Sequence, residues 1–320
     1  MNLIHASRAY DGLLIIGDPH LEARVPGFRK DDYPAVILGK LKWALDYAAA
    51  HTLLPLVTGD IFNLPRNNPN WLLVTVLQLF EREMFFVYGN HDVHENRIST
   101  DDSLAVIAEA GRGRLLDDVL VSVNMTNGRQ VIVGGSSWGT ALPKKLALPV
   151  DANPRPFVVW LTHHDLKVPG YEDRGYIRPV DLPGIDMVVN GHIHRRLGAV
   201  QKGNTVWLTP GNIARRSRSD AARSHIPAVL RIDGLSDQTF AHQHVEVPHQ
   251  PYDDVFHEAV IEAGEEERGS VFVAGLAELQ ARKTQTGEGL KGFLEKNLDR
   301  FEKEVADEIR KLAGKVTEND

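Results

Sequence analysis

The ten residues FFVYGNHDVH, numbers 85 to 94, place a group of polar side chains directly after an apolar run. A run as short and as apolar as the first four residues indicates a strand that is buried on both faces. Asn90 and Asp92 beside a glycine are common turn residues and by themselves need no further explanation. His91 and His94 are harder to explain as turn residues. The stretch therefore raises the question of whether the end of this strand carries chemistry.

The same arrangement recurs along the chain and predicts an α/β fold. Apolar runs that are each followed at once by glycine or asparagine and further polar residues occur at 13–16, 56–58, 85–88 and 187–189. Similar runs occupy 131–133, 157–162 and 205–208, and segments with apolar residues at helical spacing occupy 35–50 and 71–81. In α/β proteins, the loops at the carboxyl ends of the strands gather at one edge of the sheet, where ligands bind.

The composition limits both the chemistry and the compartment. The 320 residues include 14 histidines and no cysteine, which excludes disulfides, thiolate metal sites and cysteine nucleophiles. Any metal must therefore be held by oxygen and nitrogen. No apolar stretch approaches the roughly 18 residues of a membrane span. Because the amino terminus also lacks a signal-peptide pattern, we expect a soluble, cytoplasmic protein with no membrane partner.

Acidic residues are concentrated at the carboxyl end. Residues 251–320 contain 10 Lys and Arg against 17 Asp and Glu, whereas residues 1–250 contain 26 of each kind. We expect 1–250 to form a catalytic domain and 251–320 to form an acidic helical tail. Apolar residues in the tail recur at three- and four-residue steps, as in an amphipathic helix of about five turns. They are Leu294, Leu298, Phe301, Val305, Ile309 and Leu312.

Five loops that follow apolar runs contain side chains of the kinds that bind metals. They read Gly17-Asp18-Pro19-His20, Gly59-Asp60-Ile61-Phe62-Asn63, Gly89-Asn90-His91-Asp92, Thr162-His163-His164-Asp165 and Gly191-His192-Ile193-His194. Alternate residues of an extended chain point the same way, so Asp18 and His20 can present two ligands to one place. The same holds for the two histidines of the last loop.

Chance and ordinary structural roles explain these loops poorly. An Asp-x-His arises roughly once in a random chain of this length, whereas a Gly-His-x-His is expected on the order of 0.05 times. The alternatives are turn residues at Asp18 and Asn90, a helix cap at Asp60, and buried hydrogen-bonding histidines. Caps and turns do not explain why histidine recurs at the ends of strands, so we favour a metal site.

In this order, the five loops resemble the motifs of the calcineurin-like metallophosphoesterase superfamily. The family's pattern is Asp-x-His, Gly-Asp-x-x-Asp or Asn, Gly-Asn-His-Asp or Glu, a histidine, and Gly-His-x-His, and the resemblance spans about residues 13–212. It implies a four-layer αββα sandwich, in which helices flank two central sheets, and two divalent metal ions. Carboxylate, imidazole and amide ligands suit Mn, Fe, Zn or Co, and we expect Mn.

The resemblance also assigns roles to individual residues. One metal would be held by Asp18, His20, Asp60 and His194, and the other by Asp60, Asn90, His163 and His192. We choose His163 over His164 as the ligand because it directly follows the strand, and we expect His164 to support a ligand residue or to lie beside the substrate. His91 follows a ligand without being needed as one and resembles the family's general acid, with Asp92 orienting it.

The resemblance implies hydrolysis of a phosphoester by a metal-bridging hydroxide. The fold alone does not select the substrate. The second and third motifs are most similar to those of SbcD-type DNA repair nucleases, although Asn63 stands where those nucleases usually carry Asp. We therefore expect a DNA exonuclease or endonuclease. The alternatives are a phosphodiesterase or phosphomonoesterase acting on a nucleotide or phosphoprotein and, less favoured, a non-catalytic scaffold.

Arginines near the motifs favour a nucleic acid as the substrate. Arg195 and Arg196 directly follow the last motif, and Arg215, Arg216 and Arg218 follow the segment Thr209-Pro210-Gly211-Asn212. We expect these five side chains to lie near the metals and to contact a phosphate backbone. The alternative is a solvated loop that is paired with acidic neighbours.

The apolar stripe of the tail predicts a protein partner. SbcD-type nucleases bind the coiled-coil root of an SMC-like ATPase through carboxy-terminal helices, and the stripe could serve such a partner or a homodimer. A stripe of this kind also packs on its own domain, which is the alternative. His242 and His244, at alternate positions of an expected strand, are assigned no metal.

Overall fold

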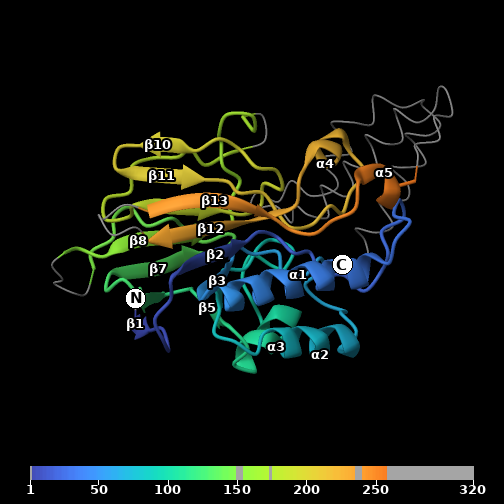
Figure 1. Ribbon diagram of the computed structural model, residues 1–320, viewed down its shortest axis with the longest axis horizontal. Coiled ribbons are helices and arrows are strands. Elements are labelled where there is room, and N and C mark those ends of the chain that lie inside the picture. Colours follow the sequence, from blue (N-terminus) through green and yellow to red (C-terminus); the bar gives the residue numbers. More distant parts are fainter. Residues whose placement is uncertain (1, 149–153, 173–174, 235–239, 258–320) are drawn as a thin grey trace, which may run out of the picture. The chain divides into compact units, whose positions relative to one another are not determined.

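The computed structural model describes residues 2–148, 154–172, 175–234 and 240–257 (Figure 1). The strands are β1 (Asn2–His5), β2 (Gly12–Ile16), β3 (Leu53–Val57), β4 (Phe85–Phe86), β5 (Arg114–Leu115), β6 (Val119–Asn124), β7 (Gln130–Ser136), β8 (Phe157–Thr162), β9 (Met187–Asn190), β10 (Val200–Lys202), β11 (Thr205–Leu208), β12 (Ala228–Gly234) and β13 (Phe240–Glu246). The helices are α1 (Tyr33–Ala50), α2 (Asn70–Leu79), α3 (Ser103–Glu109), α4 (Asp220–Ser224) and α5 (Tyr252–Val255). The predicted stripe at 294–312 lies outside the described residues, so the division into two domains stays a prediction.

Two sheets confirm the predicted α/β class. One has seven strands in the order β1-β6-β7-β8-β9-β11-β10, and the other has six in the order β13-β12-β2-β3-β4-β5. Within each sheet, the strands before the motifs run parallel to one another: β2, β3 and β4 in the six-stranded sheet, and β8 and β9 in the seven-stranded sheet. Because parallel strands end at the same edge of a sheet, the loops that follow them meet there.

Side chains of the central strands divide between separate cores. On β2, Leu13 and Ile15 belong to the core between the two sheets, whereas Leu14 and Ile16 belong to the core under the helices. All four side chains are fully buried. A strand that is covered on both faces reads as a continuous apolar run, which is why the sequence pattern locates it.

Helices cover one side of the sandwich in the described part of the chain. Figure 1 shows α1, α2 and α3 together on the side of the six-stranded sheet. The outer face of the seven-stranded sheet has its own core around Trp160 and Trp207, against which Leu142, Leu166 and Leu182 pack from irregular segments. The fourth layer is thus made of loops among the residues described, where the resemblance implies helices. None of the described helices is long and apolar enough to cross a membrane.

Helix α1 connects the outer layer to the carboxyl edge of the sheets. The Asp32 side chain accepts a hydrogen bond from Ala35 N at 3.3 Å, and Pro34 occupies the first turn, where its missing N–H leaves no bond unmade. Lys40 is buried on the inner face of the helix. Its Nζ donates to Ile213 O at 3.1 Å and so ties the helix to the loop beyond β11.

Candidate metal centre

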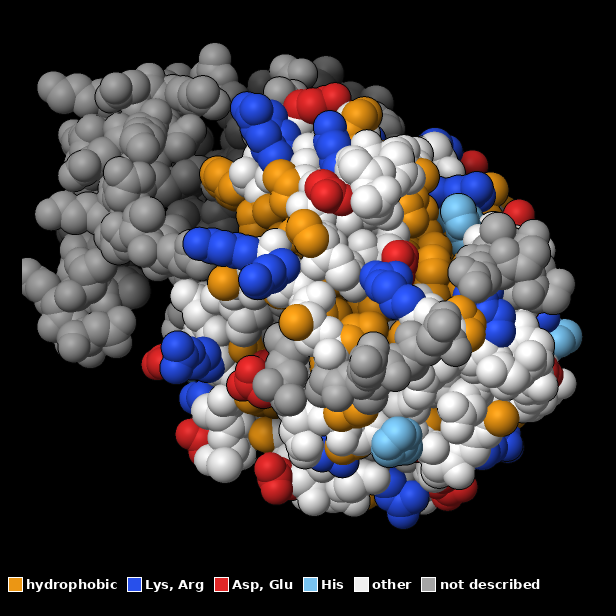
Figure 2. All heavy atoms as spheres, turned by 90° about the vertical axis from the view of Figure 1, so that its left-hand side faces the viewer, with side chains coloured by type: hydrophobic (Ala, Val, Ile, Leu, Met, Phe, Trp, Pro, Cys, Tyr) orange, Lys and Arg blue, Asp and Glu red, His pale blue; other side chains and the backbone are white. Residues whose placement is uncertain are grey.

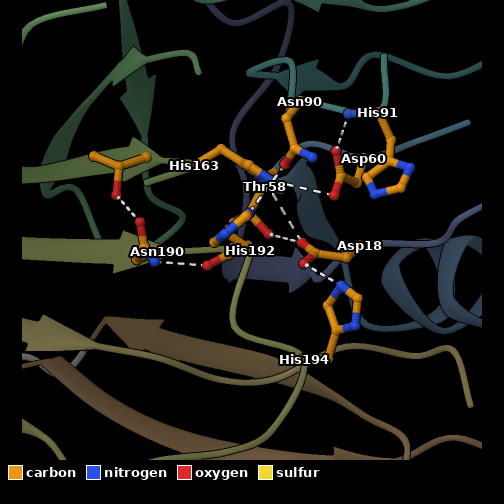
Figure 3. Close-up of polar contacts among 12 residues, drawn as sticks. Asp18, Thr58, Asp60, Asn90, His91, His163, Asn190, His192 and His194 are labelled. Carbon is orange, nitrogen blue, oxygen red and sulfur yellow. Dashed lines mark hydrogen bonds and ion pairs between the residues drawn. The ribbon is translucent and has the colours of Figure 1, made fainter. Parts of the chain in front are cut away.

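Side chains from five loops point toward one another at the carboxyl edge of the sheets (Figure 3). Asp18 and His20 follow β2, Asp60 follows β3, Asn90 follows β4, His163 follows β8, and His192 and His194 follow β9. Two groups have ligand atoms that all lie within 4.8 Å of one another, namely Asp18, His20, Asp60 and His194, and Asp60, His163 and His192. The structure therefore brings the two predicted ligand sets together, with Asp60 in both.

The first group combines two carboxylates with two imidazoles. His20 Nε2 lies 2.9 Å from His194 Nε2 and 3.6 Å from Asp60 Oδ2, and His194 Nε2 lies 3.7 Å from Asp18 Oδ2. Asp18, His20 and Asp60 are at most 2% exposed, whereas the side chain of His194 is 52% exposed. The group is thus rigidly enclosed on one side and open to solvent at His194.

The second group adds an amide oxygen. His163 Nε2 lies 3.2 Å from Asp60 Oδ2, and His192 Nδ1 lies 3.0 Å from Asn90 Oδ1. Asn90 therefore faces the group to which the sequence assigns it. Asp60 Oδ1 accepts from His91 N at 2.8 Å, so the shared carboxylate is also tied to the backbone of the Gly-Asn-His-Asp loop.

Four of these ligand residues have backbone conformations that side chains rarely adopt. Asp18, His20, Asp60 and His192 have φ values of 31°, 48°, 49° and 67°. Residues held in the left-handed region cost free energy and cluster at functional sites. The neighbouring Gly89 is needed for space, because a Cβ there would overlap the Asp60 carboxylate. The loops are shaped for the ligand arrangement rather than for local stability.

Burial and mutual contact shift the pKa values of the group. Burial raises the pKa of Asp18 to about 7, with His163 opposing this shift and Asp60 adding to it. For Asp60, burial acts to raise the pKa, but His163 and His91 outweigh it and hold the pKa well below its usual range. Burial acts to lower the pKa of His163, but Asp60 and Asp18 raise it to about 10. Two carboxylates crowded together out of water are best balanced by added positive charge.

The residues present fit divalent metal ions. Asp18 Oδ2 and His163 Nε2 are buried and complete no hydrogen bond among the described residues, although His163 Nε2 lies 3.2 Å from Asp60 Oδ2. Both residues belong to the ligand groups. Buried polar atoms are rarely left without partners, so atoms like these favour a bound cation. Two carboxylates, four imidazoles and one amide form a nitrogen and oxygen donor set that suits Mn, Fe, Zn or Co.

Supporting contacts orient the histidines, and sequence reasoning missed them. Thr58 O lies 2.6 Å from His163 Nδ1, and Asp165 Oδ1 lies 2.8 Å from His192 Nε2. Trp138 stacks on His192 at 5.1 Å between ring centroids. Histidine ligands commonly donate their second N–H to a carbonyl or carboxylate, which fixes the nitrogen that faces the metal. The one signal in the sequence was the position of Asp165, directly after the histidine pair.

The structure corrects the role predicted for Asp92. Asp92 is fully buried, and its carboxylate accepts from Phe62 N and Gly89 N, each at 2.9 Å, so it joins two loops instead of orienting His91. His91 is positioned by Asn63, whose carbonyl lies 2.9 Å from His91 Nδ1. The His91 ring is partly exposed and lies edge-on to His20 at 4.9 Å, beside the first ligand group.

His164 lies deeper than a substrate contact requires. It is 4% exposed, and its Nε2 lies 2.8 Å from Thr140 O. Burial lowers its pKa to about 4, which keeps the ring neutral. Asn190 Oδ1 accepts from His164 N at 2.9 Å, so this residue joins the ends of β8 and β9.

The five predicted arginines have different surroundings, and Arg196 is exposed. Arg215 is 7% exposed and donates to Gln250 O and His225 O, so it holds its own loop together and does not face solvent. Arg216 is partly exposed and pairs with Glu22 at 2.8 Å. The remaining two contact groups nearby, Arg218 over the ring of Phe28 at 4.4 Å and Arg195 at the carbonyl of Gly170.

Comparisons with known proteins bear on this geometry. The family model described as calcineurin-like phosphoesterase matches residues 13–196, and no curated protein matches the chain. A solved structure from Streptococcus pneumoniae, described as a conserved uncharacterised protein and predicted phosphoesterase, is 12% identical, covers 77% of this chain and 95% of its own, and has a TM-score of 0.34. A hypothetical protein from Thermus thermophilus is 11% identical, covers 74% of this chain and 99% of its own, and has a TM-score of 0.40. TM-scores this low support no conclusion about the fold or function of this chain.

The match to the family model does not depend on these two solved structures. It spans more than half of the chain and contains every one of the predicted ligand positions, from Asp18 to His194. The two sheets and the shared Asp60 are consistent with it. The chain therefore belongs to the calcineurin-like phosphoesterase family.

Proposed function

We propose that the chain is a metal-dependent phosphodiesterase that cleaves nucleic acid, similar to the SbcD-type nucleases. The observation that carries the phosphoesterase chemistry is the position of Asp60, whose Oδ2 lies 3.2 Å from His163 Nε2 and 3.6 Å from His20 Nε2. A carboxylate between two ligand groups suits a pair of neighbouring divalent metals, for which Mn is our first choice.

In this proposal, the seven predicted ligands, from Asp18 to His194, hold two metals. When bound, the metals supply Lewis acidity that activates water and neutralises charge on the phosphoryl oxygens. His91 serves the leaving group: Asn63 O fixes its Nδ1, which leaves Nε2 to deliver a proton to the oxygen that departs as the P–O bond breaks. Burial of Asp18 and Asp60 excludes water from the closed side of the site.

Motifs and charge support a nucleic acid as the substrate. Gly59-Asp60-Ile61-Phe62 and Gly89-Asn90-His91-Asp92 resemble the corresponding SbcD-type blocks. Arg216 and Arg218 are partly exposed on the loop that runs beside His194, whose carbonyl accepts from Asn212 N at 3.3 Å. Cations in this position suit a phosphate backbone.

A second candidate, hydrolysis of a small phosphoester, is favoured by a different observation. Arg215 is buried and Arg216 is already paired with Glu22, which reduces the positive charge that the loop offers to a polyanion. Figure 2 shows the left-hand side of Figure 1, at the opposite ends of the strands from the metal centre, where the described Lys and Arg side chains are scattered among apolar and acidic ones. Among the described residues, that face therefore adds no continuous basic track for a polyanion that extends beyond the metal centre.

The deciding experiment is hydrolysis of labelled single- and double-stranded DNA in the presence of Mn²⁺. Bis(4-nitrophenyl) phosphate and 4-nitrophenyl phosphate are assayed in parallel. Asp60→Asn removes the shared charge and serves as the inactive variant, and its metal content is measured by elemental analysis. Asp46→Asn, a carboxylate on the exposed face of α1, is the matched control.

Each outcome assigns the function differently. Cleavage of DNA by the wild type and by Asp46→Asn, lost with metal content in Asp60→Asn, supports the nuclease. Turnover of only the small esters refutes the nuclease and supports the second candidate. No turnover of any ester by metal-loaded protein would favour a non-catalytic scaffold.

A further inference from the structure

A groove of about 310 Å³ opens outside the metal centre, where the edges of the two sheets meet. β11 and the loop after β9 form one wall, and β12 and β13 form the other. Its floor is apolar, because Leu208 and Leu230 belong to the core between the sheets and are 5% and 1% exposed. Ligand pockets range from about 300 to 1,000 Å³, so this groove fits one small group such as a single nucleotide unit.

The rim of the groove is rich in nitrogen. Arg196, His242 and His244 line it, and the described residues of its lining include no carboxylate. The two histidines occupy alternate positions of β13, opposite Ile232 and Leu230 of β12, and therefore project from the same face of the strand. A concave surface with a guanidinium, imidazole nitrogens and no acidic group among the described residues attracts anions.

His244 has a polar atom without a partner in this wall. Its Nε2 is buried and makes no hydrogen bond among the described residues. Burial, and then the charge of Arg196, lower the pKa of His244 to about 4, so the ring is neutral near neutral pH. A buried polar atom without a hydrogen-bond partner costs free energy of folding unless a ligand supplies the partner. Nε2 can accept from a hydroxyl, or donate to an anion once the ring takes up a proton.

Two hydrogen-bonded segments of the chain join the lining of the groove to the metal centre. His194 belongs to the first ligand group, and Arg196 is two residues further along. This segment runs beside the one after β11: Asn212 N donates to His194 O at 3.3 Å, and Leu197 N donates to Thr209 O at 3.0 Å. A substrate that extends from the metal centre along this pair of segments reaches the groove.

We propose that the groove is a second phosphate subsite, in which Arg196 and His244 hold a backbone phosphate that flanks the nucleotide attacked at the metal centre. This inference rests on the proposed nuclease function and names the part of the substrate that the metals do not hold. The Arg196 guanidinium offers two parallel N–H donors to phosphate oxygens. The apolar floor accepts the sugar or the edge of a base.

Binding without catalysis tests the subsite directly. Fluorescence anisotropy of a labelled short oligothymidylate is measured in EDTA, which prevents hydrolysis. Loss of a charge-assisted hydrogen bond corresponds to about tenfold in affinity, so Arg196→Ala raises the Kd by about tenfold and His244→Gln raises it by a smaller factor. Arg196→Lys restores part of the affinity. Lys202→Ala, which removes an exposed cation from neighbouring β10, is the matched control and leaves the Kd unchanged.

Hydrolysis assays separate this inference from the proposed function. With Mn²⁺, Arg196→Ala raises the KM for the oligonucleotide and leaves kcat/KM for bis(4-nitrophenyl) phosphate unchanged, because that ester is too short to reach the groove. Equal Kd and KM values for wild type and Arg196→Ala, in a nuclease that remains active, overturn the subsite alone. Wild type that binds the oligonucleotide through Arg196 but never cleaves it retains the subsite and overturns the nuclease. Wild type that does not bind the oligonucleotide overturns the subsite.

Discussion

His192 is held by neighbours that decide which of its nitrogens faces a metal. Its Nε2 lies 2.8 Å from Asp165 Oδ1, and its Nδ1 lies 3.0 Å from Asn90 Oδ1. Because a carboxylate accepts hydrogen bonds, the ring proton belongs on Nε2, and Nδ1 presents a lone pair. Nδ1 and the amide oxygen of Asn90 then face each other as two acceptors, an arrangement that a shared cation stabilises.

We predict that Asp165→Ala weakens metal binding by about 10- to 100-fold, because the His192 ring loses the partner that fixes its tautomer and orientation. Asp165→Asn, which keeps an acceptor without the charge, gives an intermediate loss. Isothermal titration with Mn²⁺ measures both variants. Asp101→Ala removes an exposed carboxylate elsewhere and is the control. An unchanged affinity in Asp165→Ala would show that Asp165 only packs against the ring.

For His91, we predict loss of turnover without loss of metal. His91→Ala removes the proton donor, so kcat toward an ester with a poor leaving group falls by about 10²- to 10⁴-fold. Toward a nitrophenyl ester, whose leaving oxygen needs no proton, the fall is much smaller. Elemental analysis shows the same metal content as wild type. Full activity of the variant toward the poor leaving group would remove His91 as the acid.

At the scale of single residues, the sequence predicts ligand residues that lie within one loop, but not contacts between loops that are distant in the chain. Asp18, His20 and the Gly-His-x-His pair were found from their positions after apolar runs, although Asp18, His20 and His192 have left-handed backbone conformations and not the extended one that was expected. The contacts of Asp165 with His192 and of Asn63 with His91 were not found, because each joins loops separated by more than 25 residues. The role of Asp92 was mispredicted for the same reason.

At the scale of elements, buried strands were predictable from apolar runs, whereas the exposed β13 was indicated only by the alternate spacing of His242 and His244. The apolar run at 85–88 contains β4 (Phe85–Phe86), and the helical pattern at 35–50 contains most of α1 (Tyr33–Ala50). β13 (Phe240–Glu246) has mostly exposed or partly buried side chains and lies at the edge of its sheet, so it lacks an apolar run that marks a strand.

The link between α1 and the loop beyond β11 makes stability depend on pH. Burial, and then Arg215 and Arg29, lower the pKa of Lys40 from its ordinary 10.5 to about 7. Between these two values, the unfolded chain binds one more proton than the folded protein, so the free energy of unfolding rises with pH. The shift corresponds to about 5 kcal/mol over the whole window.

We therefore predict that Lys40→Met removes this rise. Urea unfolding between about pH 7 and pH 10 gives the free energy of unfolding of wild type minus that of the variant, and this difference increases with pH. Lys42→Met, on the exposed face of the same helix, leaves the pH dependence unchanged. A difference that stays flat for Lys40→Met would mean that Lys40 remains charged when folded.

At the scale of the whole molecule, the order of the motifs predicted the class of fold, because five strand-end loops can converge only if their strands end at a common edge. The covering of the outer face of the seven-stranded sheet was not predictable. Leu142, Leu166 and Leu182 cover Trp160 from segments without regular structure, and such segments have no periodic pattern to read.

We predict that removal of residues 258–320 leaves the metal centre intact, because every predicted ligand and the whole family match lie before residue 197. The shortened chain keeps its metal content and its turnover of bis(4-nitrophenyl) phosphate. Elemental analysis and the ester assay test this, and light scattering of both forms shows whether a homodimer depends on the removed residues. Loss of metal on truncation would contradict the prediction. A dimer that persists would place dimerisation outside the predicted stripe, and monomers in both forms would leave an ATPase as the proposed partner.

The ligand set is divided between the two sheets. Asp18, His20, Asp60 and Asn90 follow strands of one sheet, and His163, His192 and His194 follow strands of the other. Metal affinity therefore reports the alignment of two sets of loops, which the core between the sheets and contacts such as that of His163 Nδ1 with Thr58 O hold in register. Fragments made by a cut between β5 and β6 would each lack a complete site, and their reassembly would be visible as recovered metal binding. Metal binding at this centre would therefore measure directly whether two fragments of the chain have reassembled.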